Sequence, residues 1–179
     1  MTNKSMMIEL TQGQVTQVSL EDYSFLSDFK WCAHRNSRRR AEACYEAVRA
    51  AGRKMQLMHR AVMARMLGRE LVSTEQVDHI DRDPLNNRRE NLRLATRSEN
   101  QHNQAKRANN TSGFKGVRFD KRGRKWRAQI TVNSKYVHLG LFDTPEAAAA
   151  AYDTAALSLH DTFACVNDAE PAAAEGSVS

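Results

Sequence analysis

The sequence is poor in the residues and segments that mark several large classes of protein. It has three scattered cysteines, Cys32, Cys44 and Cys165, which argues against a disulfide framework and a four-cysteine zinc site and suits a reducing cytosol. No apolar run approaches the roughly 18 residues that span a bilayer, and the N-terminus lacks the basic stretch and apolar core of a signal peptide. We therefore expect a cytoplasmic protein with no membrane partner.

Lys and Arg are also absent from residues 139–179, which carry seven acidic side chains. Residues 97–138 instead carry eleven basic and two acidic side chains, a net charge of +9, although the whole chain has only +6. Such a concentration is typical of a phosphate-binding surface. A solvated charged face is the simpler alternative.

The length of 179 residues suffices for one ordinary domain or two small ones. Composition and pattern predict an α+β protein made of several blocks. We place a strand-rich and helical part at 1–73, a polar core at 74–108, a linker at 109–113, a third block at 114–167 and a disordered acidic tail at 168–179.

In the first block, two short alternating runs on either side of Gly13 predict a hairpin. Residues 21–29 favour a short helical turn, and residues 57–67 favour a helix that ends at Gly68. The segment 38–51 fits either a helix or a strand, and the sequence leaves both open.

The polar core carries residues suited to hydrolysing a phosphodiester. An adjacent Asp78-His79 pair is followed by Asn91 and, nine residues later, by Asn100. A histidine can deprotonate water near neutral pH, and oxygen ligands such as Asp and Asn suit Mg²⁺, which can offset charge on a phosphate.

The pattern around these residues predicts a strand, a loop, a strand and a helix. We expect strands at 77–80 and 91–95, and Thr96 and Glu99 have the spacing of a capping box for a helix that starts at Arg97. This order would bring Asp78 and His79 close to Asn100 in the first helical turn.

This block resembles the HNH endonuclease family, also called ββα-metal or His-Me finger nucleases, and especially its phage homing branch. The resemblance covers roughly residues 7–104 and is specific at the core motif. It rests on the runs Val77-Asp78-His79-Ile80-Asp81, Asn86-Asn87-Arg88 and Asn91-Leu92-Arg93, on Asn100, on His59-Arg60 and on Leu10-Thr11-Gln12-Gly13.

The resemblance implies a role for each matching residue. His79 would be the general base, while Asp78 and Asn100 would hold one Mg²⁺, or another divalent cation such as Mn²⁺. Asn91 would orient His79 and tie the two strands together. Asp81 and Asp83 are expected to hydrogen-bond their own loop backbone.

The third block predicts a three-stranded sheet with two unlike faces, followed by a helix from Pro145 to His160 with Thr144 as its N-cap. The helix would cover the apolar face. Period two assigns that face Val117, Phe119, Trp126, Ala128, Ile130, Val132, Val137 and Leu139. The opposite face is polar and basic, as a sheet that enters the major groove would need.

This block resembles the plant APETALA/ethylene-response-factor DNA-binding domain, which also occurs fused to HNH nucleases. The similarity rests on 113–118, 126–130, 138–142 and 149–153. Asp120 stands where that family has a basic residue, so DNA binding carries over but base preference does not. The residues that we expect to contact DNA are Arg118, Arg122, Arg124, Arg127, Gln129, Thr131, Lys135, Tyr136 and His138.

Together these patterns predict a metal-dependent endonuclease that nicks or cuts double-stranded DNA, works as a monomer and takes no small-molecule substrate. Two alternatives stay open at this stage. One is a DNA-binding regulator on the same scaffold that does not cleave. The other is an RNA-binding protein, which would need more exposed stacking aromatics than Tyr136.

Overall fold

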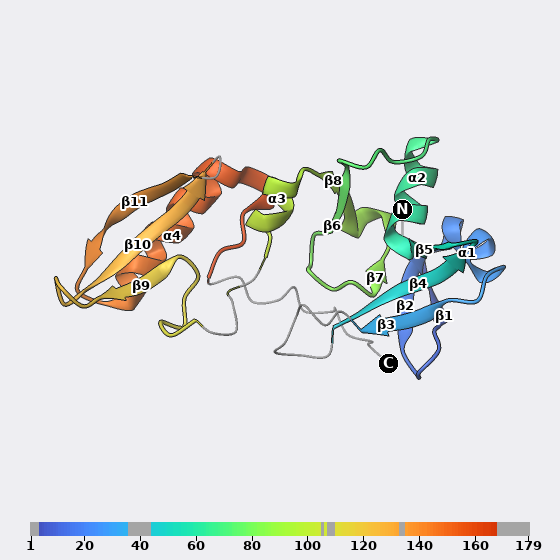
Figure 1. Ribbon diagram of the computed structural model, residues 1–179, viewed down its shortest axis with the longest axis horizontal. Helices are drawn as coiled ribbons and strands as arrows, with labels where there is room; N and C mark the ends of the chain where they lie inside the picture. Colours follow the sequence, from blue (N-terminus) through green and yellow to red (C-terminus); the bar gives the residue numbers. More distant parts are fainter. Residues whose placement is uncertain (1–3, 36–43, 105, 107–109, 133–134, 168–179) are drawn as a thin grey trace. The chain divides into compact units, whose positions relative to one another are not determined.

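The computed structural model describes residues 4–35, 44–104, 106, 110–132 and 135–167. Contacts divide the chain into two compact units, Met1–Arg97 and Ser98–Ser179, and each combines helix with small sheets (Figure 1). The predicted α+β class is confirmed. The predicted tail at 168–179 and residues 38–43 of the open segment lie outside the described residues.

The described part of the first unit contains three small sheets. Its strands are β1 (Ser5–Glu9), β2 (Val15–Ser19), β3 (Cys32–Arg35), β4 (Tyr45–Ala51), β5 (Lys54–Leu57), β6 (Gln76–His79), β7 (Asn86–Asn87) and β8 (Leu92–Ala95). They pair as β1-β2-β7, as β3-β4-β5 and as the hairpin β6-β8, with β7 parallel to β2. The predicted hairpin at Gly13 is β1-β2, and β4 shows that the described end of the open segment is a strand.

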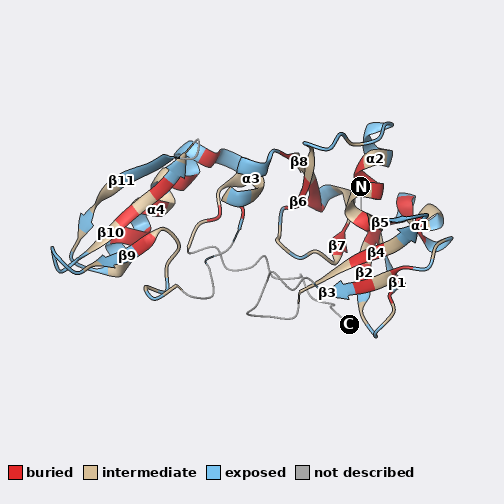
Figure 2. Ribbon diagram, in the orientation of Figure 1, coloured by how far each residue is buried: buried red, intermediate tan, exposed pale blue. Residues whose placement is uncertain are grey.

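Two helices and a 3-10 turn complete this unit: α1 (Leu20–Ser27), α2 (Met58–Leu67) and η1 (Arg89–Asn91). The helix predicted at 57–67 is confirmed as α2, and Gly68 ends it in the left-handed conformation with φ +65°. The first core gathers residues from all three sheets and both helices, buried as Figure 2 shows. Its buried members are Ile8, Leu10, Val18, Leu26, Trp31, Ala33, Ala47, Met58, Ala61, Val62, Met63, Val77 and Leu92.

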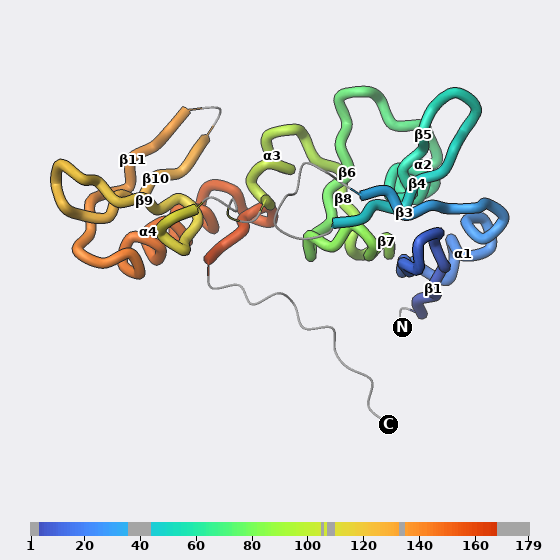
Figure 3. Tube along the Cα trace, turned by 60° about the horizontal axis from the view of Figure 1, so that its bottom comes forward, coloured from blue at the N-terminus to red at the C-terminus, as the bar shows by residue number. Residues whose placement is uncertain are grey.

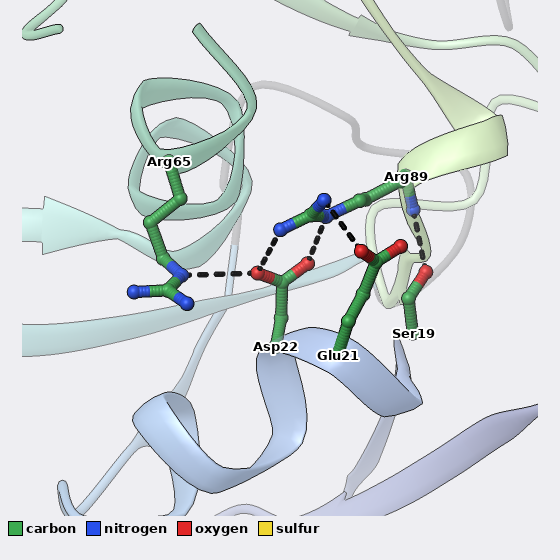
Figure 4. Close-up of polar contacts among 5 residues, drawn as sticks. All are labelled: Ser19, Glu21, Asp22, Arg65 and Arg89. Atoms are coloured by element: carbon green, nitrogen blue, oxygen red, sulfur yellow. Dashed lines mark hydrogen bonds and ion pairs between the residues drawn. The ribbon is translucent and has the colours of Figure 1, made fainter. Parts of the chain in front are cut away.

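A fully buried carboxylate ties α1, α2 and η1 together (Figure 4). Asp22, with no exposed surface, accepts hydrogen bonds from Arg65 Nε at 3.0 Å and from Arg89 Nε and Nη2 at 2.6 and 2.8 Å. Exposed Glu21 also accepts a hydrogen bond from the Arg89 side chain, and Ser19 Oγ accepts one from the backbone N–H of Arg89. This network fixes the start of the segment that leads to Asn91.

The order expected for an HNH module is present along the chain. Strand β6 pairs with β8 antiparallel, with Asp78 opposite Arg93 and His79 opposite Leu92. Helix α3 (Arg97–His102) follows two residues after β8 and begins at the predicted residue.

The second unit is a three-stranded antiparallel sheet in the order β11-β10-β9. Its elements are β9 (Val117–Asp120), β10 (Lys125–Val132), β11 (Lys135–Phe142), α4 (Pro145–His160) and η2 (Asp161–Phe163). Helix α4 lies along one face of the sheet (Figures 1 and 3). Thr144 caps it by accepting a hydrogen bond from the Ala147 N–H at 3.2 Å, as predicted.

The apolar face of this sheet packs on α4, with two exceptions. Ala128 and Ile130 are buried against α4 residues such as Tyr152. Phe119 and Val137, which we expected in the core, are 47% and 41% exposed. Both lie on strands that flank the central β10, where the helix leaves side chains uncovered.

A β-bulge on β11 changes the alternation of its side chains. Ala128 pairs with Gly140 but the next residue, Gln129, pairs with His138, so Leu139 is the extra residue. Beyond the bulge, Leu141 lies opposite Arg127 and therefore on the polar face. Period-two reasoning alone does not place it there.

Gly116 lies in close contact with α4, against the ring of Tyr152. Its φ is +76°, and a Cβ added there would lie 2.0 Å from Cδ2 of the Tyr152 ring, which is buried. A left-handed conformation costs a non-glycine residue about 1–2 kcal/mol, and overpacking adds roughly 1–3 kcal/mol. We expect Gly116→Ala to lower the melting temperature of the second unit by on the order of 10–20 °C.

Fluorine NMR of protein labelled with 5-fluorotryptophan measures this, because Trp31 and Trp126 report on one unit each. Gly113→Ala is the control for backbone strain, since φ is +82° there but nothing lies within 4 Å of the added Cβ. Gly123→Ala, with neither strain nor contact, should be nearly neutral. Equal losses for Gly116→Ala and Gly113→Ala would contradict a clash with Tyr152.

Candidate nuclease site and nucleic-acid interface

Asp78 lies near the end of β6 and is held by its cross-strand neighbour. Arg93 donates from Nε at 2.9 Å and from Nη2 at 2.7 Å to the same oxygen, Oδ2. The Asp78 residue is only 5% exposed, and Arg93 faces it in the register of the hairpin. The carboxylate therefore has a defined orientation at the end of the strand.

His79 follows at the strand end and is 9% exposed. Burial lowers its pKa, against the raising effects of the Asn87 hydrogen bond and of nearby carboxylates such as Asp81. The His59 ring meets the His79 ring edge-on, with centroids 5.1 Å apart. Burial first, then His79 and Arg60, lowers the pKa of His59 to about 3. Both rings are therefore neutral at pH 7, the state in which an imidazole can accept a proton.

The tautomer of His79 follows from a chain of buried hydrogen bonds. Thr16 Oγ donates to the carbonyl of Leu85 at 2.7 Å, so it accepts the 2.8 Å bond from Asn87 Nδ2. Asn87 Nδ2 also donates to the carbonyl of Pro84, which turns Oδ1 toward His79 Nε2 at 3.3 Å. Because Oδ1 only accepts, Nε2 carries the proton and Nδ1 carries the basic lone pair.

Asn91 braces the loop between the strands. Its Nδ2 donates to Asp81 Oδ1 and to the Asn86 carbonyl, both at 2.8 Å, and its Oδ1 accepts from the Asp81 N–H at 3.0 Å. Its backbone carbonyl accepts from Ile80 N–H. The bonds to Ile80 and Asp81 reach the two residues that directly follow His79, and a role of Asn91 in orienting His79 stays a prediction.

The two loop aspartates fold the loop onto itself. Asp81 accepts from the Asp83 N–H at 2.8 Å and Asp83 from the Leu85 N–H at 2.9 Å. This is the backbone bonding expected of them from the sequence. Their carboxylates therefore serve the turn that delivers Asn86 and Asn87.

Asn100 lies on α3, within the second unit. Its pairing with Asp78 as a metal ligand stays a prediction. A carboxylate and an amide oxygen are hard ligands of the kind that Mg²⁺ prefers. Among the described residues no group of three or more His, Cys, Asp or Glu side chains could hold a metal. Mg²⁺ commonly keeps several waters and binds substrate phosphate, so one carboxylate and one amide oxygen are donors of a kind that it accepts.

The polar face of the β9-β10-β11 sheet gathers most of the residues expected to contact DNA. Five of them line an open pocket of about 320 Å³: Arg118, Arg127, Gln129, Tyr136 and His138. The other four, Arg122, Arg124, Thr131 and Lys135, are exposed on the same sheet or in the turn before β10. Contact between Arg127 and DNA stays a prediction, and in the structure its Nη2 donates to Asp120 Oδ2.

Asp120 is itself held in place at the start of the turn after β9. The hydrogen bond from Arg127 and then the backbone N–H of Arg122 lower the pKa of the Asp120 carboxyl. Arg127 Nε is buried without a hydrogen-bond partner among the described residues. The basic face therefore contains one arginine with a fixed position.

Comparison with known proteins identifies the first module. A model of the HNH endonuclease family matches residues 56–102. Protein 3.8 of Escherichia phage T7 is 40% identical over 88 residues, which are 49% of this chain and 72% of that protein. An uncharacterized HNH endonuclease of Acanthamoeba polyphaga mimivirus is 31% identical over 156 residues, 87% of this chain and 76% of that protein. The chain belongs to the HNH endonuclease family.

This member of the HNH endonuclease family carries a second module after the first. A model of the AP2 domain matches residues 112–161. APETALA2-like protein 2 of Oryza sativa is 44% identical over 57 residues, 32% of this chain but only 13% of that protein. The predicted order, an HNH module followed by an AP2-like sheet, is confirmed.

Sequence reasoning did not predict the roles of four residues near the candidate sites. Asn87 and Thr16 fix His79, Asp120 holds Arg127, and Leu141 joins the polar face. Asn87 had a sequence signal as part of the Asn86-Asn87-Arg88 motif, and Asp120 had one as an acidic residue where the resembled DNA-binding family has a basic residue. No helix in the described part of the chain has the length and apolar character needed to cross a membrane.

Proposed function

We propose that this protein is a metal-dependent endonuclease that hydrolyses phosphodiester bonds of duplex DNA, of the homing type of phages and mobile elements. The observation that carries the proposal is the Asp78-His79 pair at the end of β6. Its histidine is buried, neutral and fixed as one tautomer by Asn87. A fixed neutral imidazole beside an oriented carboxylate suits base-assisted, metal-assisted hydrolysis.

Each residue has one part in the proposed reaction. His79 Nδ1 takes the proton of the attacking water, and the P–O bond to the leaving oxygen breaks as the new P–O bond forms. Asp78 and Asn100 would hold Mg²⁺ or Mn²⁺, which supplies charge stabilisation at the phosphate and at the leaving oxygen when bound. Asn91 and Asn87 keep the loop and the imidazole in place.

The AP2-like sheet would anchor the enzyme on double-stranded DNA. Its exposed basic residues Arg118, Arg122, Arg124 and Lys135 suit phosphates. Arg127 and Gln129 line the pocket and can reach base edges. The protein would act as a monomer on a polymeric substrate, with no small-molecule substrate.

The proposal predicts metal-dependent cleavage. Purified protein should convert supercoiled plasmid to nicked or linear DNA with Mg²⁺ or Mn²⁺, and should lose all conversion in EDTA, because hydrolysis needs charge stabilisation at the phosphate. Agarose gels measure the products. Restoring excess Mg²⁺ after EDTA is the control for damage to the protein. Binding of duplex DNA without conversion in any divalent cation would reject the nuclease.

That last result would favour a second function, a DNA-binding regulator that does not cleave. One observation supports it: the Asp78 carboxylate is buried and already ion-paired with Arg93. A metal ion would have to share this carboxylate with the guanidinium. The plasmid assay with a parallel binding measurement separates the two functions.

A further inference from the structure

Arg127 occupies the centre of the polar sheet face. It lies on the middle strand, opposite Arg118 on β9 and Leu141 on β11. Like charges directly opposite each other in a sheet repel. Two arginines in register therefore need either a nearby anion or freedom to move apart.

Asp120 supplies this anion. It restricts the side-chain motion of Arg127 but not that of Arg118. Its Oδ2 binds Arg127 Nη2 at 2.5 Å, and its Oδ1 accepts from the Arg122 N–H at 3.1 Å. The Asp120 side chain is 16% exposed and that of Arg127 is 34% exposed, whereas Arg118 is exposed. The turn thus fixes Asp120, and Asp120 fixes Arg127.

Among the described residues, Arg127 uses only one of its N–H donors in a hydrogen bond. Its polar contact among the described residues is the one to Asp120, and its buried Nε has no partner. A guanidinium has five N–H donors, so the hydrogen bond to Asp120 leaves both hydrogens of Nη1 and one hydrogen of Nη2 to bind a ligand. These donors lie on a side chain that lines the pocket with Gln129 and His138.

We propose that Asp120 is a positioning residue that gives this protein sequence specificity, by holding Arg127 in the geometry that recognises a guanine. This inference rests on the proposed function, because it takes DNA as the ligand of the sheet. Guanine presents two acceptors, O6 and N7, in the major groove, and a guanidinium matches them with two parallel hydrogen bonds. A guanidinium that is held in place before binding loses less conformational entropy when it forms these two hydrogen bonds.

A fixed arginine suits a base better than a phosphate. Phosphates recur along the backbone and are met by flexible cations, whose contacts position the protein but carry no sequence information. The exposed Arg118 fits that use. A partly buried side chain that Asp120 holds in position can meet one acceptor pair in one place, so it discriminates between bases.

The test is selection from a library of randomised duplexes, with the full chain in EDTA so that no DNA is cut. Asp120→Ala removes the clamp. Asp143→Ala is its matched control, because it removes the same charge from the same unit at an exposed surface pair with Lys125. Arg127→Lys keeps a cation that can still pair with Asp120 but lacks the fork, and Asp120→Ala is repeated in that background.

We expect the wild type to enrich sites with a required guanine and Asp120→Ala to lose about tenfold in discrimination at that position, within the range for one bidentate contact. Its affinity for non-specific DNA should stay equal or rise, and Asp143→Ala should keep the discrimination. Arg127→Lys should lose the preference for guanine at the same base position. Adding Asp120→Ala to Arg127→Lys should not reduce that preference further.

Three results would contradict the proposed role of Asp120. The first is a wild type with no sequence preference, and the second is an equal effect of Asp120→Ala and Asp143→Ala on binding to all sequences. The third is a further loss of discrimination when Asp120→Ala is added to Arg127→Lys. The fluorine signal of labelled Trp126 confirms that each variant is folded, which separates positioning from stability. A chain that retains no duplex at all would reject the proposed DNA partner itself.

Discussion

His79→Ala is expected to reduce plasmid cleavage by about 10²–10⁴-fold, the usual contribution of a positioned general base. Burial lowers the pKa of this histidine, so it is neutral near pH 7. Asn87 holds Nε2, which leaves Nδ1 as the atom that takes a proton from water. The rate of conversion of supercoiled plasmid at saturating Mg²⁺ measures the loss.

Two variants make this result interpretable. His34→Ala removes an exposed histidine from β3 of the same unit and should cleave at the wild-type rate. Asn87→Ala should lose part of the activity, because the imidazole keeps its base but not its fixed tautomer. His79→Ala removes a buried partner of Asn87, so folding of the first unit is checked through labelled Trp31. Wild-type cleavage by folded His79→Ala would show that another group is the base.

Local sequence was sufficient to predict the order of elements around the candidate site. The strand at 77–80, the helix start at Arg97 and the cap at Thr144 depend on spacing and residue type within a few positions. The AP2-like sheet was predictable for the same reason, since its three strands follow one another within a few residues along the chain. Such features need no knowledge of distant contacts.

The contacts that position the site side chains could not be predicted, because they join residues far apart in the chain. Thr16 and Asn87 are 71 positions apart, and Asp22 and Arg89 are 67 apart. These contacts depend on how the three small sheets of the first unit pack on one another. The spacing of apolar and polar residues within one segment of the sequence does not specify that packing. The bulge at Leu139 is a different case, in which one extra residue changes the face of everything after it.

The charge pattern gains a more specific meaning from the structure. The segment 97–138, with its net charge of +9, lies almost wholly in the second unit and supplies β9, the turn before β10 and β10 itself. Within it, the acidic Asp120 is bound to Arg127 on the basic face. Counted as a charge alone, Asp120 would be expected to lower the affinity of the sheet for DNA. Its contact with Arg127 instead suits a role in selecting between DNA sequences.

Asp22→Ala should produce the largest loss of stability in the first unit, about 2–4 kcal/mol. Breaking a buried ion pair by removing one partner costs roughly 3–5 kcal/mol. The value here is lower because Arg65 and Arg89, with side chains 40% and 25% exposed, can turn partly to water. The three hydrogen bonds that Asp22 accepts would all be lost (Figure 4). Urea unfolding followed through labelled Trp31, which packs in the same core, measures the change.

Glu21→Ala is the matched control, since it removes the neighbouring carboxylate that binds the same Arg89 at 2.7 Å. Its side chain is 62% exposed, and such surface pairs contribute only about 0–1 kcal/mol. The Trp126 signal of the second unit should be unchanged in both variants. Cleavage by Asp22→Ala should fail together with the fold of the first unit, because Arg89 begins the turn that ends at Asn91. If the two variants unfold at the same urea concentration, burial of Asp22 contributes nothing beyond a surface contact.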